Sequence, residues 1–284
     1  MDSDRQPDGG VEPTPDPAGP GPDPGPPLYK MGTTQQRIRS LLHTVVLVAG
    51  AFLASNVFAL AALQAAVVAG LITVPAGFSS VADLPTSGTV LLFVMNFVGF
   101  FAVGWAYLRW RGESVFDTSL YDLGLPSLRQ AGQALAGLVV LFVVLGLISN
   151  VAAQFGLTPS ENVTQTLGEG NPELLLYLIP IALLLNGPIE EFLFRGLVQG
   201  LFRDAYGILP GIALSAAVFG VVHYFAVSGG GGNIAYTLVV ITALGTLLGV
   251  LYEWSENLFV PGLVHGLFNA IQYAGLYLVT TGGA

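Results

Sequence analysis

Charged side chains are scarce in this chain of 284 residues. Only 10% of its residues are Asp, Glu, Lys or Arg, whereas 53% are hydrophobic. Soluble domains carry about 25% charged residues, so the composition excludes an ordinary soluble fold. Long tracts contain no Asp, Glu, Lys or Arg at all, at residues 41–74, 84–108, 130–160, 205–252 and 257–284. Because a membrane-spanning helix needs about 20 apolar residues, we predict an all-α, polytopic transmembrane helical bundle.

Cysteine is absent, which excludes disulfide bonds and thiolate metal sites. The net charge of −9 is concentrated near the N-terminus, where residues 1–27 carry six acidic side chains against a single arginine. A segment so rich in Pro and Gly cannot bury a core. We therefore divide the chain into a disordered acidic tail (1–30), N-terminal membrane helices with an interfacial connector (31–170), and a C-terminal membrane core (171–284).

Positive charge flanks the first three apolar spans on one face, at residues 30–39, 109–111 and 129. The positive-inside rule makes this face cytoplasmic. We therefore expect an integral protein of the cell membrane with its N-terminus in the cytoplasm.

The tripeptide NGP at 186–188 interrupts the apolar run 172–203. If this run crossed the membrane once, Glu190 would lie close to one face and His223 nearer the other. We therefore favour two short helices that meet at the NGP motif. This gives about eight membrane segments with both termini cytoplasmic, or seven if 172–203 is one broken helix.

Three ionisable residues lie together just after this motif, in the stretch "GPIEEFLFRGLVQG". A charged side chain facing lipid costs roughly 2.5–3.5 kcal/mol even on lenient scales, so these groups must point inward or pair. Glu191 and Arg195 have the i, i+4 spacing of a helical ion pair. Glu190 is rotated by about 100° around the helix, which leaves it without a cation of its own.

Two further apolar segments each carry one polar face. His223 follows Phe219 by four residues in "FGVVH", and His265 precedes Asn269 by four in "HGLFN". Carboxylate, imidazole and carboxamide groups suit the hydrolysis of an amide, with a glutamate as general base and His or Asn donors for the oxyanion. Glu190, His223 and His265 could equally ligate Zn²⁺ with a water in the fourth position. No HExxH motif is present.

The stretches "EEFLFRG", "FGVVH" and "HGLFNA" resemble the three signature motifs of the CPBP family, EExxxR, FxxxH and HxxxN or HxxxD, in this order. This family of intramembrane proteases includes type II CAAX prenyl endopeptidases and bacteriocin-processing or immunity proteins. The resemblance covers roughly residues 170–280, and the first 170 residues match only in being apolar spans.

The resemblance implies a role for each motif residue. Glu190 would activate the attacking water with His223 as its partner, while Glu191 and Arg195 support the site. His265 and Asn269 would stabilise the oxyanion. Apart from the resemblance, we expect Phe219 either to fill the core or to shield the catalytic water.

The resemblance leaves open whether a metal takes part, and the family has been interpreted both as metalloproteases and as metal-free glutamate proteases. Because the one acidic ligand must also serve as the base, we favour the metal-free interpretation and expect no certain cofactor. The partners would be a peptide or prenylated protein substrate and membrane lipids, with no nucleic acid. Two alternatives are a non-catalytic immunity or scaffold protein and a proton-coupled transporter. No inverted repeat of broken helices, which is typical of transporters, is visible in the sequence.

Overall fold

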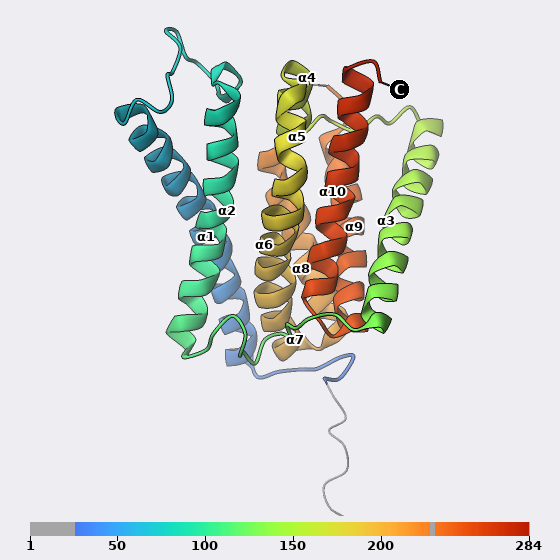
Figure 1. Ribbon diagram of the computed structural model, residues 1–284. Helices are drawn as coiled ribbons and strands as arrows, with labels where there is room; N and C mark the ends of the chain where they lie inside the picture. Colours follow the sequence, from blue (N-terminus) through green and yellow to red (C-terminus); the bar gives the residue numbers. More distant parts are fainter. Residues whose placement is uncertain (1–25, 228–230, 284) are drawn as a thin grey trace, which may run out of the picture.

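The computed structural model describes residues 26–227 and 231–283, and this part of the chain is all-helical with no β-strand. Figure 1 shows the helices arranged as one bundle. In chain order they are α1 (Thr34–Val68), α2 (Thr86–Arg111), α3 (Leu128–Gln154), α4 (Val163–Gly170), α5 (Pro172–Ile181), α6 (Gly187–Glu191), α7 (Gly200–Tyr206), α8 (Ile208–Val222), α9 (Ile234–Ser255) and α10 (Phe259–Thr280).

Six stretches of helix in the described residues are long and apolar enough to cross a membrane. The predicted transmembrane helical bundle is therefore confirmed. Helices suit this environment because each satisfies its backbone hydrogen bonds internally. The interior is apolar as well, and its largest cluster joins α1, α2 and α9 to the segment 192–201 through side chains such as Leu47, Leu108, Phe194 and Tyr252.

Residues 172–206 form one continuous helix, so the preferred pair of short helices meeting at the NGP motif is wrong. Two wide π-helical turns, Ala182–Asn186 and Phe192–Gln199, lie within it. Asn186 (φ −58°, ψ −63°) and Gly187 (φ −55°, ψ −58°) both keep right-handed helical backbone angles. A proline removes one backbone donor and crowds the preceding turn. The π turn before Pro188 is the kind of local adjustment by which membrane helices tolerate proline.

Gly187 is required by the packing of this long helix against α10. A Cβ atom at this position would clash with both the Gly262 carbonyl oxygen and the Gly266 nitrogen. Small residues at such crossings let two membrane helices approach backbone to backbone. The NGP motif therefore marks the place where two helices cross, and not the end of a helix.

The expected mismatch in depth between Glu190 and His223 disappears in this arrangement. Glu190 lies 16 residues before the end of α7 at Tyr206, and His223 lies 15 residues after the start of α8 at Ile208. At about 1.5 Å per residue, both lie roughly 22–24 Å along their helices from the turn that joins α7 to α8. One crossing by residues 172–206 thus brings the two groups to the same level.

The two ends of the described chain lie at opposite ends of the bundle (Figure 1). Seven helical segments account for this in the described residues. Six are the stretches that are long and apolar enough to cross a membrane, in α1, α2, α3, the continuous helix 172–206, α8 and α9, and the seventh is α10. The expectation that both termini share one side of the membrane is therefore wrong, because it assumed an even number of crossings.

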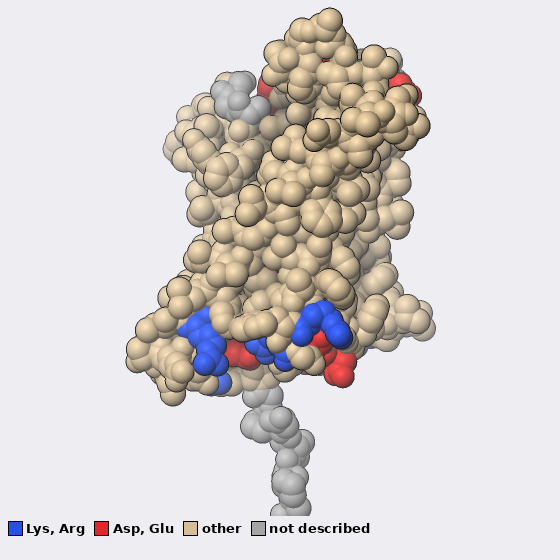
Figure 2. All heavy atoms as spheres, turned by 90° about the vertical axis from the view of Figure 1, so that its left-hand side faces the viewer, with Lys and Arg blue, Asp and Glu red and all other residues tan. Residues whose placement is uncertain are grey.

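Basic residues gather at the lower end of the molecule, while its long middle carries almost no charge on the face seen in Figure 2. In the described chain, every Lys and Arg except Arg195 belongs to this end: Lys30, Arg37, Arg39, Arg109, Arg111, Arg129 and Arg203. The charged residues of the opposite end are Asp83, Glu161, Glu169 and Glu173. The bundle thus has the charge asymmetry of an oriented membrane protein.

Most of the acidic tail predicted to be disordered, residues 1–25, lies outside the described residues. The segment that follows it pairs with the turn between α7 and α8. The nitrogens of Lys30 and Gly32 donate to the carbonyls of Tyr206 and Ala205 at 2.8 and 3.0 Å, and Ile208 N donates to Pro27 O at 3.1 Å. The end of the segment assigned to the tail is therefore bound to the lower end of the bundle.

The seven-segment arrangement can be tested by labelling single cysteines, because the chain has none of its own. We expect Thr281→Cys and Asp117→Cys, both at exposed positions, to react with a membrane-impermeant maleimide from opposite sides of sealed vesicles. Ser79→Cys, in the loop between α1 and α2, should react from the same side of the vesicles as Thr281→Cys. Labelling of Thr281→Cys and Asp117→Cys from the same side would contradict this topology.

Candidate active site

The polar residues predicted from the three motifs meet in the interior of the bundle. The long helix supplies Glu190, Glu191 and Arg195 from its middle, His223 directly follows the last residue of α8, and α10 supplies His265 and Asn269. α10 packs directly against α6 and against the π turn before it. Segments far apart in the sequence therefore contribute to one site.

Glu191 and Arg195 form the expected i, i+4 ion pair, with 2.8 Å between Arg195 Nη1 and Glu191 Oε1. Both residues are 0% exposed. His265 Nδ1 lies 2.9 Å from the same carboxylate oxygen. A buried charge is tolerated only when it is paired and hydrogen-bonded, and Glu191 meets this requirement with two donors.

Arg195 also links the long helix to α8 and α9 through two contacts. Its Nη2 donates to the Gly245 carbonyl oxygen of α9 at 2.8 Å. Its guanidinium lies 4.4 Å from the ring centroid of Phe219, a cation–π contact that is strongest where water is excluded. The Phe219 ring is in turn 4.3 Å from the His223 ring. Phe219 is thus a buried platform between the ion pair and His223.

Glu190 has a different environment from its neighbour. Its Oε1 accepts a hydrogen bond from Asn186 Nδ2 at 2.6 Å, whereas its Oε2 has no hydrogen-bond partner. His223 Nε2 lies 3.9 Å from Oε2. The side chains of His223 and Glu190 are 23% and 15% exposed. The Oε2 atoms of Glu190 and Glu191 are both buried without a hydrogen-bond partner, but only the Glu191 side chain is fully buried.

The hydrogen bonds fix which nitrogen of each imidazole carries a proton. His223 Nδ1 lies 2.7 Å from the Phe219 carbonyl oxygen, and a carbonyl can only accept, so Nδ1 donates. In the same way His265 Nδ1 donates to the Glu191 carboxylate. The Nε2 atom of each neutral ring is therefore left with its lone pair. Either Nε2 can donate a hydrogen bond only when its ring is protonated.

Asn186 belongs to this site, although the sequence analysis treated it only as part of a helix break. It lies four residues before Glu190 and bonds to it, while its Oδ1 accepts from Asn269 Nδ2 at 2.6 Å. The i, i+4 spacing from Glu190 is the signal that could have found it. That signal was hidden by the assumption that the helix stops at Gly187.

The geometry does not favour the suggested zinc site. Within the described ranges, no group of three His, Asp or Glu side chains is placed to hold a metal ion. The candidate ligands are divided between two centres, because Glu190 faces His223 while His265 is bonded to Glu191. We therefore derive no chemical step through a metal.

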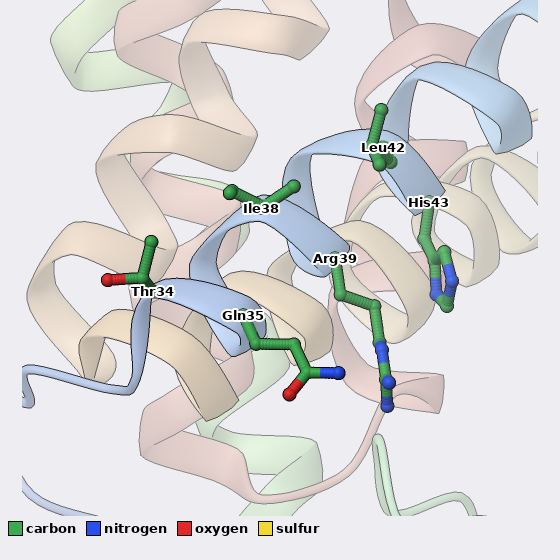
Figure 3. Close-up of a pocket in the computed structure, with 6 residues that line it drawn as sticks. All are labelled: Thr34, Gln35, Ile38, Arg39, Leu42 and His43. Atoms are coloured by element: carbon green, nitrogen blue, oxygen red, sulfur yellow. The ribbon is translucent and has the colours of Figure 1, made fainter.

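A shallow groove also lies on the first turns of α1, away from these residues (Figure 3). Its lining comes from one face of that helix: Thr34, Gln35, Ile38, Arg39, Leu42 and His43. It contains none of the predicted site residues. The chemistry suggested by the sequence therefore lies inside the bundle and not in this groove.

Comparison with known proteins bears on the same part of the chain. Residues 172–271 match the family model of "Type II CAAX prenyl endopeptidase Rce1-like" proteins. This segment is therefore similar to that family. It carries all six polar residues predicted for the site, from Glu190 to Asn269.

A curated relative matches over a shorter region. "Uncharacterized protein YpbD" of Bacillus subtilis (strain 168) is 32% identical over 82 residues, which are 29% of this chain and 36% of that protein. The match thus spans about a third of that relative's length. No solved structure matches the chain.

The ion pair between Glu191 and Arg195 should contribute strongly to the stability of the protein. We expect Arg195→Met to destabilise the protein by about 3–5 kcal/mol, because it leaves the Glu191 carboxylate buried without its cation. Glu190→Gln is the matched control and should change stability by less than about 1 kcal/mol. Unfolding in detergent, followed by circular dichroism, measures both. Equal stability of the two variants would show that the pair has no structural role.

Proposed function

We propose that this protein is an intramembrane endopeptidase in which Glu190 activates a water molecule. One observation carries the proposal: the unpartnered Glu190 Oε2 lies 3.9 Å from His223 Nε2 in a partly enclosed site. One water can hydrogen-bond to both atoms across such a gap. Catalytic hydrogen bonds are often longer in the absence of substrate.

The proposed reaction is a general-base hydrolysis. The water oxygen attacks the scissile carbonyl carbon while Glu190 Oε2 takes one of its protons. The carbonyl becomes an oxyanion, the C–N bond then breaks, and the leaving nitrogen receives the proton held by Glu190. One water is consumed, and a carboxyl and an amine are formed.

The two adjacent glutamates are suited to different tasks. The carboxylate of Glu191 is engaged by Arg195 at 2.8 Å and by His265 at 2.9 Å. Glu190 has an amide donor on one oxygen, and its second oxygen has no hydrogen-bond partner. We assign the general base to Glu190 and a supporting role to Glu191 and Arg195.

Donors for the oxyanion would come from α10. Asn269 Nδ2 uses one N–H on Asn186 and has a second to offer. His265 can donate from Nε2 only as an imidazolium, since its Nδ1 proton is held by Glu191. We therefore assign the oxyanion contact to Asn269 first and to protonated His265 second.

The substrate class rests on the family match. We propose that the substrate is a membrane-associated peptide, with the C-terminal region of a prenylated protein as the first candidate. The basic lower end of the bundle would face the cytoplasm of the cell, together with the N-terminus. The C-terminus would then lie on the opposite side of the membrane.

The proposal is tested with purified protein in lipid nanodiscs, using farnesylated and unmodified C-terminal peptides. We expect the wild type to cleave and Glu190→Gln to lose about 10²–10⁴-fold in kcat, because the amide cannot accept the water proton. Cleavage should continue in the presence of a chelator.

Two results would overturn this function. Cleavage that stops on chelation and returns with zinc would make a metal, and not Glu190 alone, the activator of water. Equal activity of Glu190→Gln and wild type, or no cleavage by either on any peptide, would favour a non-catalytic membrane protein.

A further inference from the structure

We propose that Asn186 is a positioning residue that selects which oxygen of Glu190 acts as the base and links it to Asn269. This inference rests on the proposed function, since it concerns the same reaction. It starts from a chain of two hydrogen bonds, Asn269 Nδ2 to Asn186 Oδ1 and Asn186 Nδ2 to Glu190 Oε1, each 2.6 Å long.

The direction of this chain is set by its carboxylate end. An ionised carboxylate only accepts hydrogen bonds, so the Asn186 atom that faces Glu190 must be its nitrogen. The atom that faces Asn269 is then the Asn186 oxygen, and Asn269 must present its own nitrogen. The amide orientations are therefore forced by the charge on Glu190.

The chain makes the two oxygens of Glu190 unequal. Oε1 is engaged by Asn186, while Oε2, without a hydrogen-bond partner, faces His223. A short hydrogen bond to the charged form stabilises that form and holds its orientation. Asn186 thus holds the orientation of Glu190 and aims Oε2 at the position of the water.

The same chain joins the base to the group assigned to the oxyanion. Asn186 lies in the π turn Ala182–Asn186, which packs against α10. Asn269 lies on α10 and is held by the Asn186 oxygen. One amide therefore sets the spacing between the groups on the two sides of the scissile carbonyl.

The first test compares variants of Asn186 with a matched control. Asn186→Ala should lower kcat by about 10–100-fold, the usual loss when a supporting hydrogen bond to a reactive group is removed, with KM little changed. The control is Asn96→Ala in α2, whose side-chain amide donates to the Leu92 carbonyl of its own helix. That variant should keep the wild-type kcat.

The second test uses the isosteric variant Asn186→Asp, which can still accept from Asn269. It puts a second carboxylate against Glu190, and two neighbouring carboxylates resist ionising together. We expect the acid limb of the kcat/KM profile to move to higher pH by about one unit or more. An acid limb that does not move would overturn the inference, because it would show that the side chain at position 186 does not contact the base.

Coupling through the chain gives a third readout. Asn269→Ala removes the donor that holds the Asn186 oxygen, so the losses of Asn186→Ala and Asn269→Ala should not add in the double variant. Additive losses in kcat would show that the two amides act independently and would overturn the link between them.

An infrared titration decides the inference separately from the proposed function. The carboxyl band of Glu190 is the band that disappears in Glu190→Gln. Its intensity is followed against pH in the protein without substrate, so no cleavage is needed. A shift of its midpoint to higher pH in Asn186→Ala and Asn186→Asp supports the positioning role. Unchanged midpoints would overturn it, whether or not the wild type cleaves a peptide.

Discussion

The rest of the site depends on the compensation of charge inside an apolar bundle. Arg195 is fully buried and reaches the Glu191 carboxylate, the Gly245 carbonyl and the face of Phe219. Since an unpaired charge in this environment would be very costly, these contacts fix how the long helix, α8 and α9 meet. His265 adds α10 by its bond to Glu191. One ion pair therefore holds the four segments around the proposed reaction centre.

The same arrangement explains why two adjacent glutamates can differ in function. Glu191 is enclosed and neutralised, so it serves as a fixed anchor. Glu190 points to another side of the helix, where it meets an amide from its own helix and an imidazole from α8. Its second oxygen is buried and has no hydrogen-bond partner, within a side chain that is 15% exposed. In the proposed reaction the ion pair would stabilise the scaffold, and Glu190 would act as the base.

Much of this site could be predicted from the sequence, because charge is so rare in the chain that Glu190, Arg195 and His223 had to serve a purpose. The helical class followed from the uncharged tracts. The path of residues 172–206 could not be read in the same way. A glycine followed by a proline usually ends a helix. Here the helix continues through a π turn and packs against Gly262 and Gly266, which only the structure shows. That error also gave the wrong side for the C-terminus and hid Asn186, whose role depends on an unbroken helix.

In the proposed reaction, water attacks the peptide bond directly and Glu190 only carries its proton. Repeated turnover in H₂¹⁸O, followed by mass spectrometry of both product and enzyme, tests this step. We expect ¹⁸O in the new carboxyl terminus of the product and none in the Glu190 side chain. Incorporation of ¹⁸O into Glu190 would contradict it, because it would show that this carboxylate attacks the carbonyl itself and forms an anhydride that water then opens.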